Sequence, residues 1–288
     1  MRVLVRAAAI VPFAAVVAVL LILKRQRKGK MNVTTEKANL GNIQTACAQL
    51  IRLGEEIVHS LNQANPKTDR VMLFQLSALR AIRLASACLL LDENGYVEEV
   101  LALTRTLSEV AINACYLQMA ADQEVASFRV FDIQKSFRMS ENLAKKMDAT
   151  DTISVQERVK LQGIAAAART KSQRKDNDMS WSTDHVAIRA EKLDKTMASG
   201  TEMFSLLKGS TYEFAHPFVH GTYQSFRAVS RLMSEGTFPA DGDRETERIQ
   251  ALGGVNQCLL ALCVYAHVKL GLPIEAEIHE ASRINLAP

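Results

Sequence analysis

Two short groups of residues in this 288-residue chain combine side-chain types that could do chemistry. The first is Arg105 and Glu109, which stand four positions apart in a largely apolar segment. Side chains at this spacing share one face of a helix and can bond to each other. A charge pair in apolar surroundings is either buried with partners or lines a cavity. The simpler interpretation is a salt bridge along the helix that supports packing.

The second group extends from Tyr212 to His220 and contains two histidines. His216 and His220 are four positions apart, and Tyr212 lies one turn earlier on the same face of an unbroken helix. Pro217 removes a backbone donor and can kink the helix at this point. A His-x-x-x-His pair resembles half of a zinc site, but Pro217 stands where the general-base glutamate would follow the first histidine. The sequence does not identify the two further ligands that a zinc site would need.

A Glu-x-x-His motif occurs twice, at Glu56 and His59 and again at Glu213 and His216. Two such motifs on separate helices, with two further glutamates, form the di-iron site of ferritin-like bundles. Glu109 could supply one of those glutamates, but no fourth carboxylate stands out and the spacing arises readily by chance. No cofactor is therefore predicted, and iron or zinc at these four motif residues is kept as an alternative.

Other catalytic signatures are weak or missing. Arg52 and His59 have the loose spacing seen in HEPN-type helical ribonucleases, but Leu53 stands where a polar residue commonly follows the arginine. Chance explains this match better. The chain has no Gly-rich phosphate loop, no Gly-x-Ser-x-Gly motif and no kinase signature. ATP-driven chemistry and α/β-hydrolase chemistry are not expected.

The apolar residues follow helical spacing nearly throughout, with no strand pattern and no repeat of fixed period. The first long helix is predicted over residues 35–62. The next, over 68–91, is apolar on nearly all sides near its end and is therefore expected to be central. A capping-box pattern at 154–157 starts another helix near residue 155. Further helices are predicted over 96–120, 122–147, 182–198, 201–220, 222–234 and 243–271. The sequence predicts an all-α fold.

The N-terminus predicts a membrane anchor. Ala7 to Leu23 is a run of seventeen residues without a charged or strongly polar side chain. A helix over residues 3–24 is long enough to cross a hydrocarbon layer of roughly 30 Å. A secretory signal peptide is the alternative, but the apolar run ends in basic residues rather than at the small residues of a cleavage site. These basic residues are expected to contact anionic lipid headgroups, and they are Lys24, Arg25, Arg27, Lys28 and Lys30.

The basic residues also predict the orientation. Five follow the span and two precede it, so the positive-inside rule places the C-terminal side in the cytoplasm. Residues 1–30 are therefore expected to be a single-pass anchor of the cell inner membrane with its N-terminus outside. Residues 31–288 are expected to form a cytosolic multi-helix bundle.

Charge and cysteine content limit the partners and the compartment. Residues 1–30 hold seven of the 35 Lys and Arg and none of the 31 Asp and Glu, which leaves 28 against 31, or −3, for the remainder. A nucleic-acid partner is therefore not expected. The cysteines are five in number, with no Cys-x-x-Cys pair. In a reducing compartment they are interpreted as buried, unpaired side chains.

Several short motifs together resemble a known family. Arg105-Thr106-Leu107-Ser108-Glu109 is followed by Ile112 and Tyr116-Leu117, and much later Tyr212 leads to Val219-His220-Gly221. This arrangement resembles the bacterial domain-of-unknown-function family five-six-seven-seven, over roughly residues 65–230. The chain has His216 where the family usually shows a small Ser or Cys. The resemblance implies an all-helical domain, no assigned reaction, and a candidate cluster of Arg105, Glu109, Tyr212 and His220.

These observations favour a membrane-tethered helical domain that binds a protein partner or a small anionic ligand at that cluster. Arg105 would offer a planar fork to a carboxylate or phosphate. The enzyme alternative is a hydrolase of nucleic acid or phosphoesters, with His220 as acid and base and Arg105 stabilising an anion. A homo-oligomer is compatible with either hypothesis.

Overall fold

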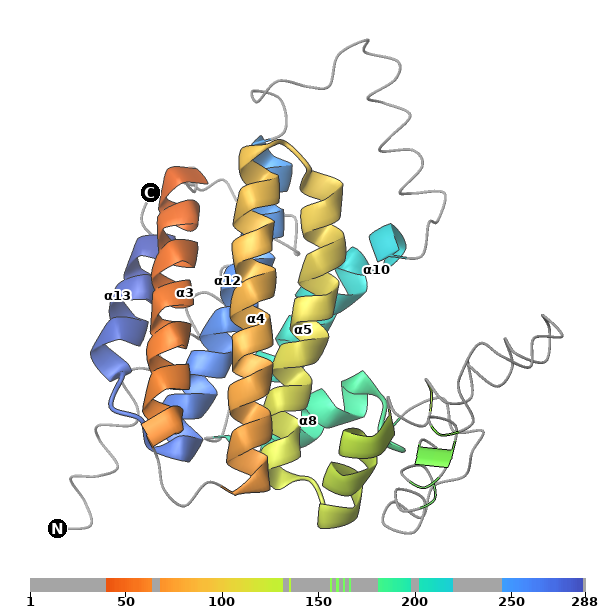
Figure 1. The fold of residues 1–288 in the computed structure, drawn as a ribbon. Coiled ribbons are helices and arrows are strands. Elements are labelled where there is room, and N and C mark those ends of the chain that lie inside the picture. The colour runs from red at the N-terminus through yellow and green to blue at the C-terminus, as the bar shows by residue number, and fades with distance from the viewer. Residues whose placement is uncertain are drawn as a thin grey trace, which may run out of the picture. The chain divides into compact units, whose positions relative to one another are not determined.

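The computed structural model describes residues 40–63, 68–131, 181–197, 202–219 and 245–286, with a few single helical positions between 135 and 166. Every regular element within these residues is a helix, and no strand occurs among them, which confirms the all-α prediction (Figure 1). The chain divides into two compact units, Met1–Tyr116 with Val186–Pro288 and Leu117–His185. The helix predicted to start near residue 155 is described only at a few helical positions, and the helix predicted over 222–234 lies outside the described residues.

The first three described helices are long. They are α3 (Leu40–Gln63), α4 (Asp69–Glu93) and α5 (Val97–Met119). Thr68 caps α4 by accepting a hydrogen bond from the Val71 N–H. The turn into α5 contains Gly95 at φ 78°, a left-handed conformation that glycine adopts without a Cβ clash. The boundaries predicted for α4 and α5 are confirmed to within two residues.

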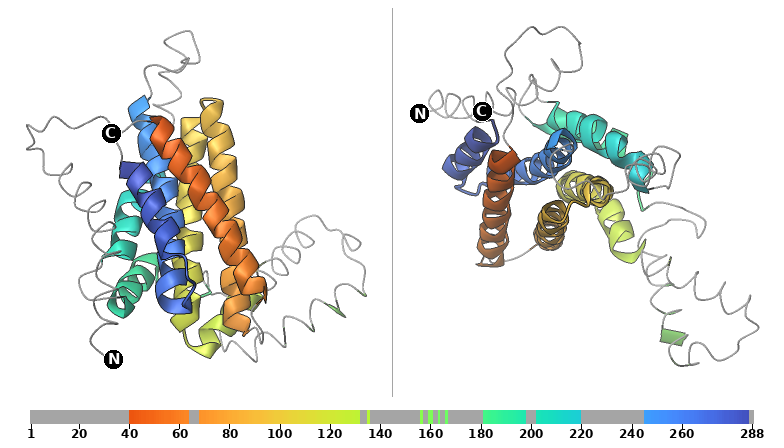
Figure 2. Two further views of the ribbon diagram at one scale, coloured as in Figure 1. Left: turned by 90° about the vertical axis from the view of Figure 1, so that its left-hand side faces the viewer. Right: turned by 90° about the horizontal axis from the view of Figure 1, so that it is seen from above.

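The centre of the first unit is α12 (Glu245–Leu270). Its residues from Ala251 to Ala266 are buried at every position except Gly253 and Gln257, because helices contact it on several sides. It packs against α3 and α4, and the views in Figures 1 and 2 agree on its place among them. The helix ends at Gly271 (φ 72°), where the Leu272 N–H bonds back to the Ala266 carbonyl.

The prediction that residues 68–91 form the central helix is wrong. Three leucines of α4 are exposed, with Leu76 at 56 %, Leu79 at 44 % and Leu90 at 62 %. α4 and α12 are both long and apolar, so composition does not separate them. The neighbours decide which one is enclosed.

Composition also leaves membrane insertion open. By length and composition alone α4 and α12 could each cross a bilayer, which is weak evidence because core helices pass the same test. In α12 this apolar stretch is mostly buried inside the protein. The predicted anchor over residues 3–24 and its basic flank lie outside the described residues, so the anchor stays a prediction.

A short C-terminal helix, α13 (Glu275–Leu286), was not predicted from the sequence. Ile278 and Ala281 of this helix are buried, as is Ile274 directly before its first residue, and these positions follow at intervals of four and three. The helix packs against α3 and α12 (Figure 2). The amphipathic spacing spans little more than two turns, which is too short to stand out from chance in the sequence.

The remaining helices of this unit are α8 (Val186–Thr196) and the stretch from Met203 to Val219. That stretch consists of α9 (Met203–Leu207), the π-helix η1 (Lys208–Tyr212) and α10 (Glu213–Val219). Asp194 of α8 accepts hydrogen bonds from the Phe204 and Ser205 N–H groups at 2.8 and 2.9 Å, so it caps α9 from outside. Burial raises the pKa of Asp194 above its ordinary value.

The second unit is described by a few contacts of its own. Its helix over 122–131 carries Phe128, whose ring meets the buried Trp181 edge-on at 5.0 Å between centroids. The Ser182 hydroxyl donates a hydrogen bond to Glu124. The helix predicted over 122–147 is confirmed through residue 131.

Candidate functional site

Arg105 of α5 contacts Tyr212 of η1, although the two residues are 107 positions apart in the sequence. Arg105 Nη2 donates a hydrogen bond of 2.8 Å to the Tyr212 hydroxyl. The guanidinium carbon also lies 4.5 Å from the centroid of the tyrosine ring, within the range of a cation–π contact. The structure therefore brings together two of the four residues in the predicted cluster.

The other two members of that cluster are not joined to this pair. Glu109 is half-buried on α5 and makes no ion pair with Arg105, because the guanidinium turns to Tyr212 instead. The predicted bond along the helix is therefore not formed. His220 lies outside the described residues.

The guanidinium of Arg105 is incompletely satisfied. Its Nε is buried and has no hydrogen-bond partner among the described residues. A buried N–H without an acceptor costs about 1–3 kcal/mol, more when the group is charged. Such a donor is where an acceptor oxygen of a ligand would be favoured.

Tyr212 reaches Arg105 from the last position of a π-helix. In η1 the backbone bonds connect residues five apart, as between the Glu213 N–H and the Lys208 carbonyl. Single π turns within α-helices are frequent at functional sites. Gly209 lies within Lys208–Tyr212 and is a poor helix former, but this composition does not by itself predict a π turn.

The side chains next to Tyr212 attach η1 to α12. The hydroxyls of Ser210 and Thr211 both donate to Gln257 Oε1, each at 3.1 Å. Gly254 permits this approach, because a Cβ there would lie 3.0 Å from Thr104 Cγ2 and 3.1 Å from Thr211 Cγ2. The sequence analysis did not predict these residues. The adjacent Gly253 and Gly254 of α12 were the available signal of a close approach between helices.

We call this region the polar junction, where α5, η1 and α12 meet. Its deepest contact is between Ser108 and Cys258, whose Oγ and Sγ atoms are 3.3 Å apart and fully buried. Burial raises the pKa of the Cys258 thiol, which keeps it protonated and a poor nucleophile. The junction consists of Thr104, Arg105, Ser108, Ser210, Thr211, Tyr212, Gly254, Gln257 and Cys258.

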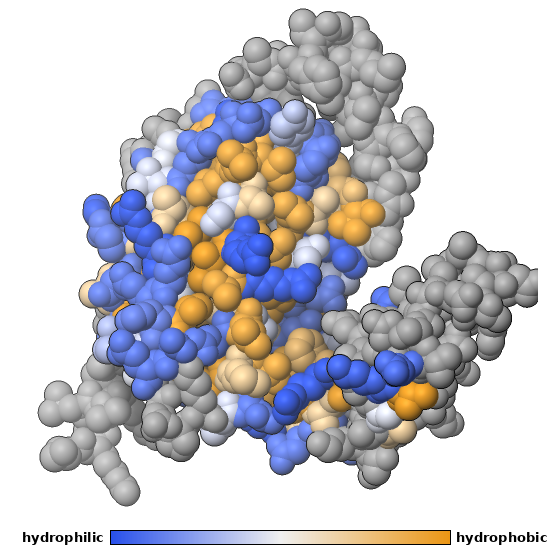
Figure 3. All heavy atoms as spheres, in the orientation of Figure 1, coloured by the Kyte–Doolittle hydropathy of each residue, from blue (hydrophilic) through white to orange (hydrophobic). Residues whose placement is uncertain are grey.

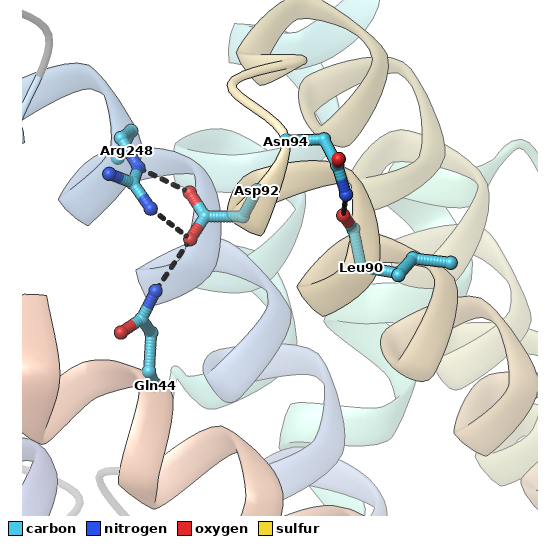
Figure 4. A network of polar contacts seen from close by, with 5 residues as sticks. All are labelled: Gln44, Leu90, Asp92, Asn94 and Arg248. Carbon is cyan, nitrogen blue, oxygen red and sulfur yellow. Dashed lines mark hydrogen bonds and ion pairs between the residues drawn. The ribbon is translucent and has the colours of Figure 1, made fainter. Parts of the chain in front are cut away.

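A second polar network lies near the C-terminal end of α4 (Figure 4). Asp92 of α4 is buried and accepts two hydrogen bonds of 2.9 Å from Arg248 of α12 and one of 2.8 Å from Gln44 of α3. The helix α4 continues through Asp92, one residue past the end predicted at 91. With three hydrogen bonds from two residues the carboxylate is well satisfied, so this network joins three helices and does not require a ligand.

The structure separates the two Glu-x-x-His motifs. Glu56 and His59 are exposed on α3, where His59 bonds to Gln63 at 2.9 Å. Glu213 of α10 pairs with Lys208, and the side chain of His216 lies outside the described residues. α3 and α10 lie on opposite sides of α12 in Figures 1 and 2. Within the described part of the chain, no three His, Cys, Asp or Glu side chains are grouped to hold a metal ion.

The prediction for the cysteines is confirmed. All five are buried and unpaired, and burial raises the pKa of the Cys47 and Cys115 thiols.

Comparison with known families identifies the family of the chain, and the description of that family names no activity. Residues 72–237, more than half of the chain, match the model of a family of unknown function, DUF5677. The chain belongs to this family. The resemblance of the Arg105 and Tyr212 segments to it is thereby confirmed, and both residues lie within the matched range. No curated protein matches the chain, and no solved structure matches it. The central helix α12 and the flanking helices α3 and α13 of this DUF5677 protein lie outside the matched residues.

Proposed function

We propose that this DUF5677 protein is a membrane-tethered helical domain that binds a small anionic ligand at the polar junction. The observation that carries the proposal is the buried Arg105 Nε without an acceptor, in a guanidinium otherwise held in place by Tyr212. A guanidinium presents its donors in a fixed planar fork that matches carboxylate and phosphate oxygens. Stacking on the tyrosine ring orients that fork before a ligand arrives.

The chemistry of the junction supports binding rather than catalysis. Its described members are an arginine, hydroxyls, an amide and a protonated thiol, which recognise anions and form hydrogen bonds. The hydrolase alternative requires His220 as acid and base. No observation favours that alternative, because His220 is outside the described residues.

Binding is tested with purified full-length chain in detergent, titrated with orthophosphate and, separately, with succinate in a calorimeter. Arg105→Met removes the fork, and we expect about tenfold to hundredfold weaker binding, because a hydrogen bond to a charged group is worth about 1.5–3 kcal/mol. Arg105→Lys keeps the charge and is expected to bind more weakly than the original chain.

The matched control is Arg283→Met, which removes an exposed arginine of α13 far from the junction in sequence and is expected to leave binding unchanged. Absence of binding of either anion, or equal binding by Arg105→Met and the control, contradicts the proposal. The tether is tested separately, since a single-pass anchor keeps the chain in the membrane fraction after washing with high salt and alkaline carbonate.

A further inference from the structure

One face of α4 is exposed and carries three leucines and two arginines. The exposed residues between Leu76 and Leu90 fall within about one third of the helix circumference at 3.6 residues per turn, and they span about 21 Å along the axis. We call this surface the α4 outer face. It consists of Leu76, Leu79, Arg80, Arg83, Ser86 and Leu90.

The α4 outer face has a charged centre. Arg80 and Arg83 are exposed near the middle of the helix, with leucines on either side, and this face carries no acidic residue between Leu76 and Leu90. Figure 3 shows the corresponding surface as hydrophobic area with hydrophilic atoms in its middle. Exposed leucines that gather on one face around charged residues are typical of an interaction surface.

We propose that the α4 outer face docks on the surface of an anionic lipid bilayer. Leucines on such a face bury themselves at the boundary between headgroups and acyl chains. Arginines among them extend their guanidinium groups to the lipid phosphates and bond them bidentately. The face thus complements both the acyl chains, through its leucines, and the headgroup phosphates, through its arginines.

A second copy of the chain fits this face less well. The two arginines lie close to the midpoint of α4, so a two-fold partner would place its own Arg80 and Arg83 opposite them in either helix direction. Like charges brought together in an apolar interface are unfavourable. An anionic surface removes this conflict.

The sequence allows the domain to reach the membrane in this orientation. In this respect the inference rests on the tether of the proposed function. Fifteen residues separate Lys24 from Leu40 and span at most about 50 Å when extended. The axis of α4 is about 37 Å long, so the connection is long enough for α4 to lie along the bilayer.

The test places a fluorescent probe on the face of the full-length chain. Ser86→Cys is labelled with a bimane dye, and the buried native thiols are expected to remain unlabelled. The labelled chain is added to phosphatidylcholine vesicles with and without phosphatidylglycerol, both containing lipid brominated on its acyl chains. The control is Ala276→Cys, an exposed position on α13. We expect bromolipid to quench the probe at position 86 in the anionic vesicles and to leave the probe at position 276 bright.

The arginines set the size of the effect. One basic residue near an anionic surface contributes about 1 kcal/mol, so Arg80→Gln with Arg83→Gln should lower the ratio of docked to undocked chains about thirtyfold. Both residues are exposed, and the helical circular dichroism of the variant should be unchanged.

Three results would overturn the inference. The first is a probe at position 86 that stays bright while the chain remains bound to anionic vesicles. This result would contradict the docking but not the membrane tether of the proposed function. The second is quenching that does not depend on the two arginines. The third is quenching by a nitroxide-labelled second copy in detergent, which would assign the face to self-association. Chains that leave the vesicles altogether contradict the docking and the tether together.

Discussion

The buried pair of Asp92 and Arg248 should contribute more to stability than any other single ionic contact described above. Asp92 is 1 % exposed and Arg248 13 %, and two hydrogen bonds of 2.9 Å join them. Arg248→Met would leave the Asp92 carboxylate buried with Gln44 as its remaining described partner. Removing one member of a buried pair typically costs about 3–5 kcal/mol, and we expect a loss of this size.

The chain contains a matched control for this experiment. Arg283 bonds Glu280 through the same two kinds of nitrogen atom, but the side chains are 73 % and 51 % exposed. Arg283→Met should therefore cause no measurable loss, because water screens an exposed pair. The assay is urea-induced unfolding of the full chain, followed by far-ultraviolet circular dichroism.

A double variant separates the pair from its surroundings. Asp92→Leu with Arg248→Met removes both charges, so its loss should be smaller than the sum of the two single losses by about 2–3 kcal/mol. If Arg248→Met unfolds at the same urea concentration as Arg283→Met, burial does not strengthen the pair and the reasoning is refuted.

Three further predictions concern packing, thiols and pH. Gly254→Ala should lower the free energy of unfolding by about 1–3 kcal/mol, because its Cβ would crowd two buried threonines. Gly253→Ala, with nothing within 4 Å, should raise it by up to about 1 kcal/mol in the same urea assay. The five buried thiols should react with Ellman's reagent only after unfolding, and rapid reaction in the native state would contradict their burial. Because the pKa of Asp194 is raised, the folded chain binds this proton more tightly than the unfolded chain does. The contribution of Asp194 to stability therefore falls as pH rises from 3.8 through the raised pKa. Asp194→Asn should flatten that slope above pH 3.8, and an unchanged slope would count against the assignment.

Local signals in the sequence were enough to predict most of the helices. The ends of α4 and α5 depend on the turn at Asn94 and Gly95, and α12 ends at Gly271, so short-range chemistry sets these boundaries. The helix α13 was missed because its apolar face is little more than two turns long.

Long-range partners could not be read in the same way. Asp92 meets Arg248 across 156 positions, and no local pattern links a residue near a turn to an arginine in a distant helix. The Arg105 and Tyr212 pair was anticipated through the family resemblance and not through spacing. The π turn that presents Tyr212 is attached to α12 through the bond from Thr211 to Gln257, a long-range contact that the sequence of η1 alone does not specify.

The packing of α3 has a consequence for how the protein is made. Its buried face contacts α12 and α13, and α12 begins 182 positions after α3 ends at Gln63. At about 5–20 residues per second, a ribosome needs roughly 10–40 s to synthesise that interval. α4 is synthesised early and covers part of α3, whereas the part of α3 that packs against α12 and α13 stays uncovered until those helices are synthesised. The apolar side of the first described helix therefore remains available to chaperones until translation is almost finished.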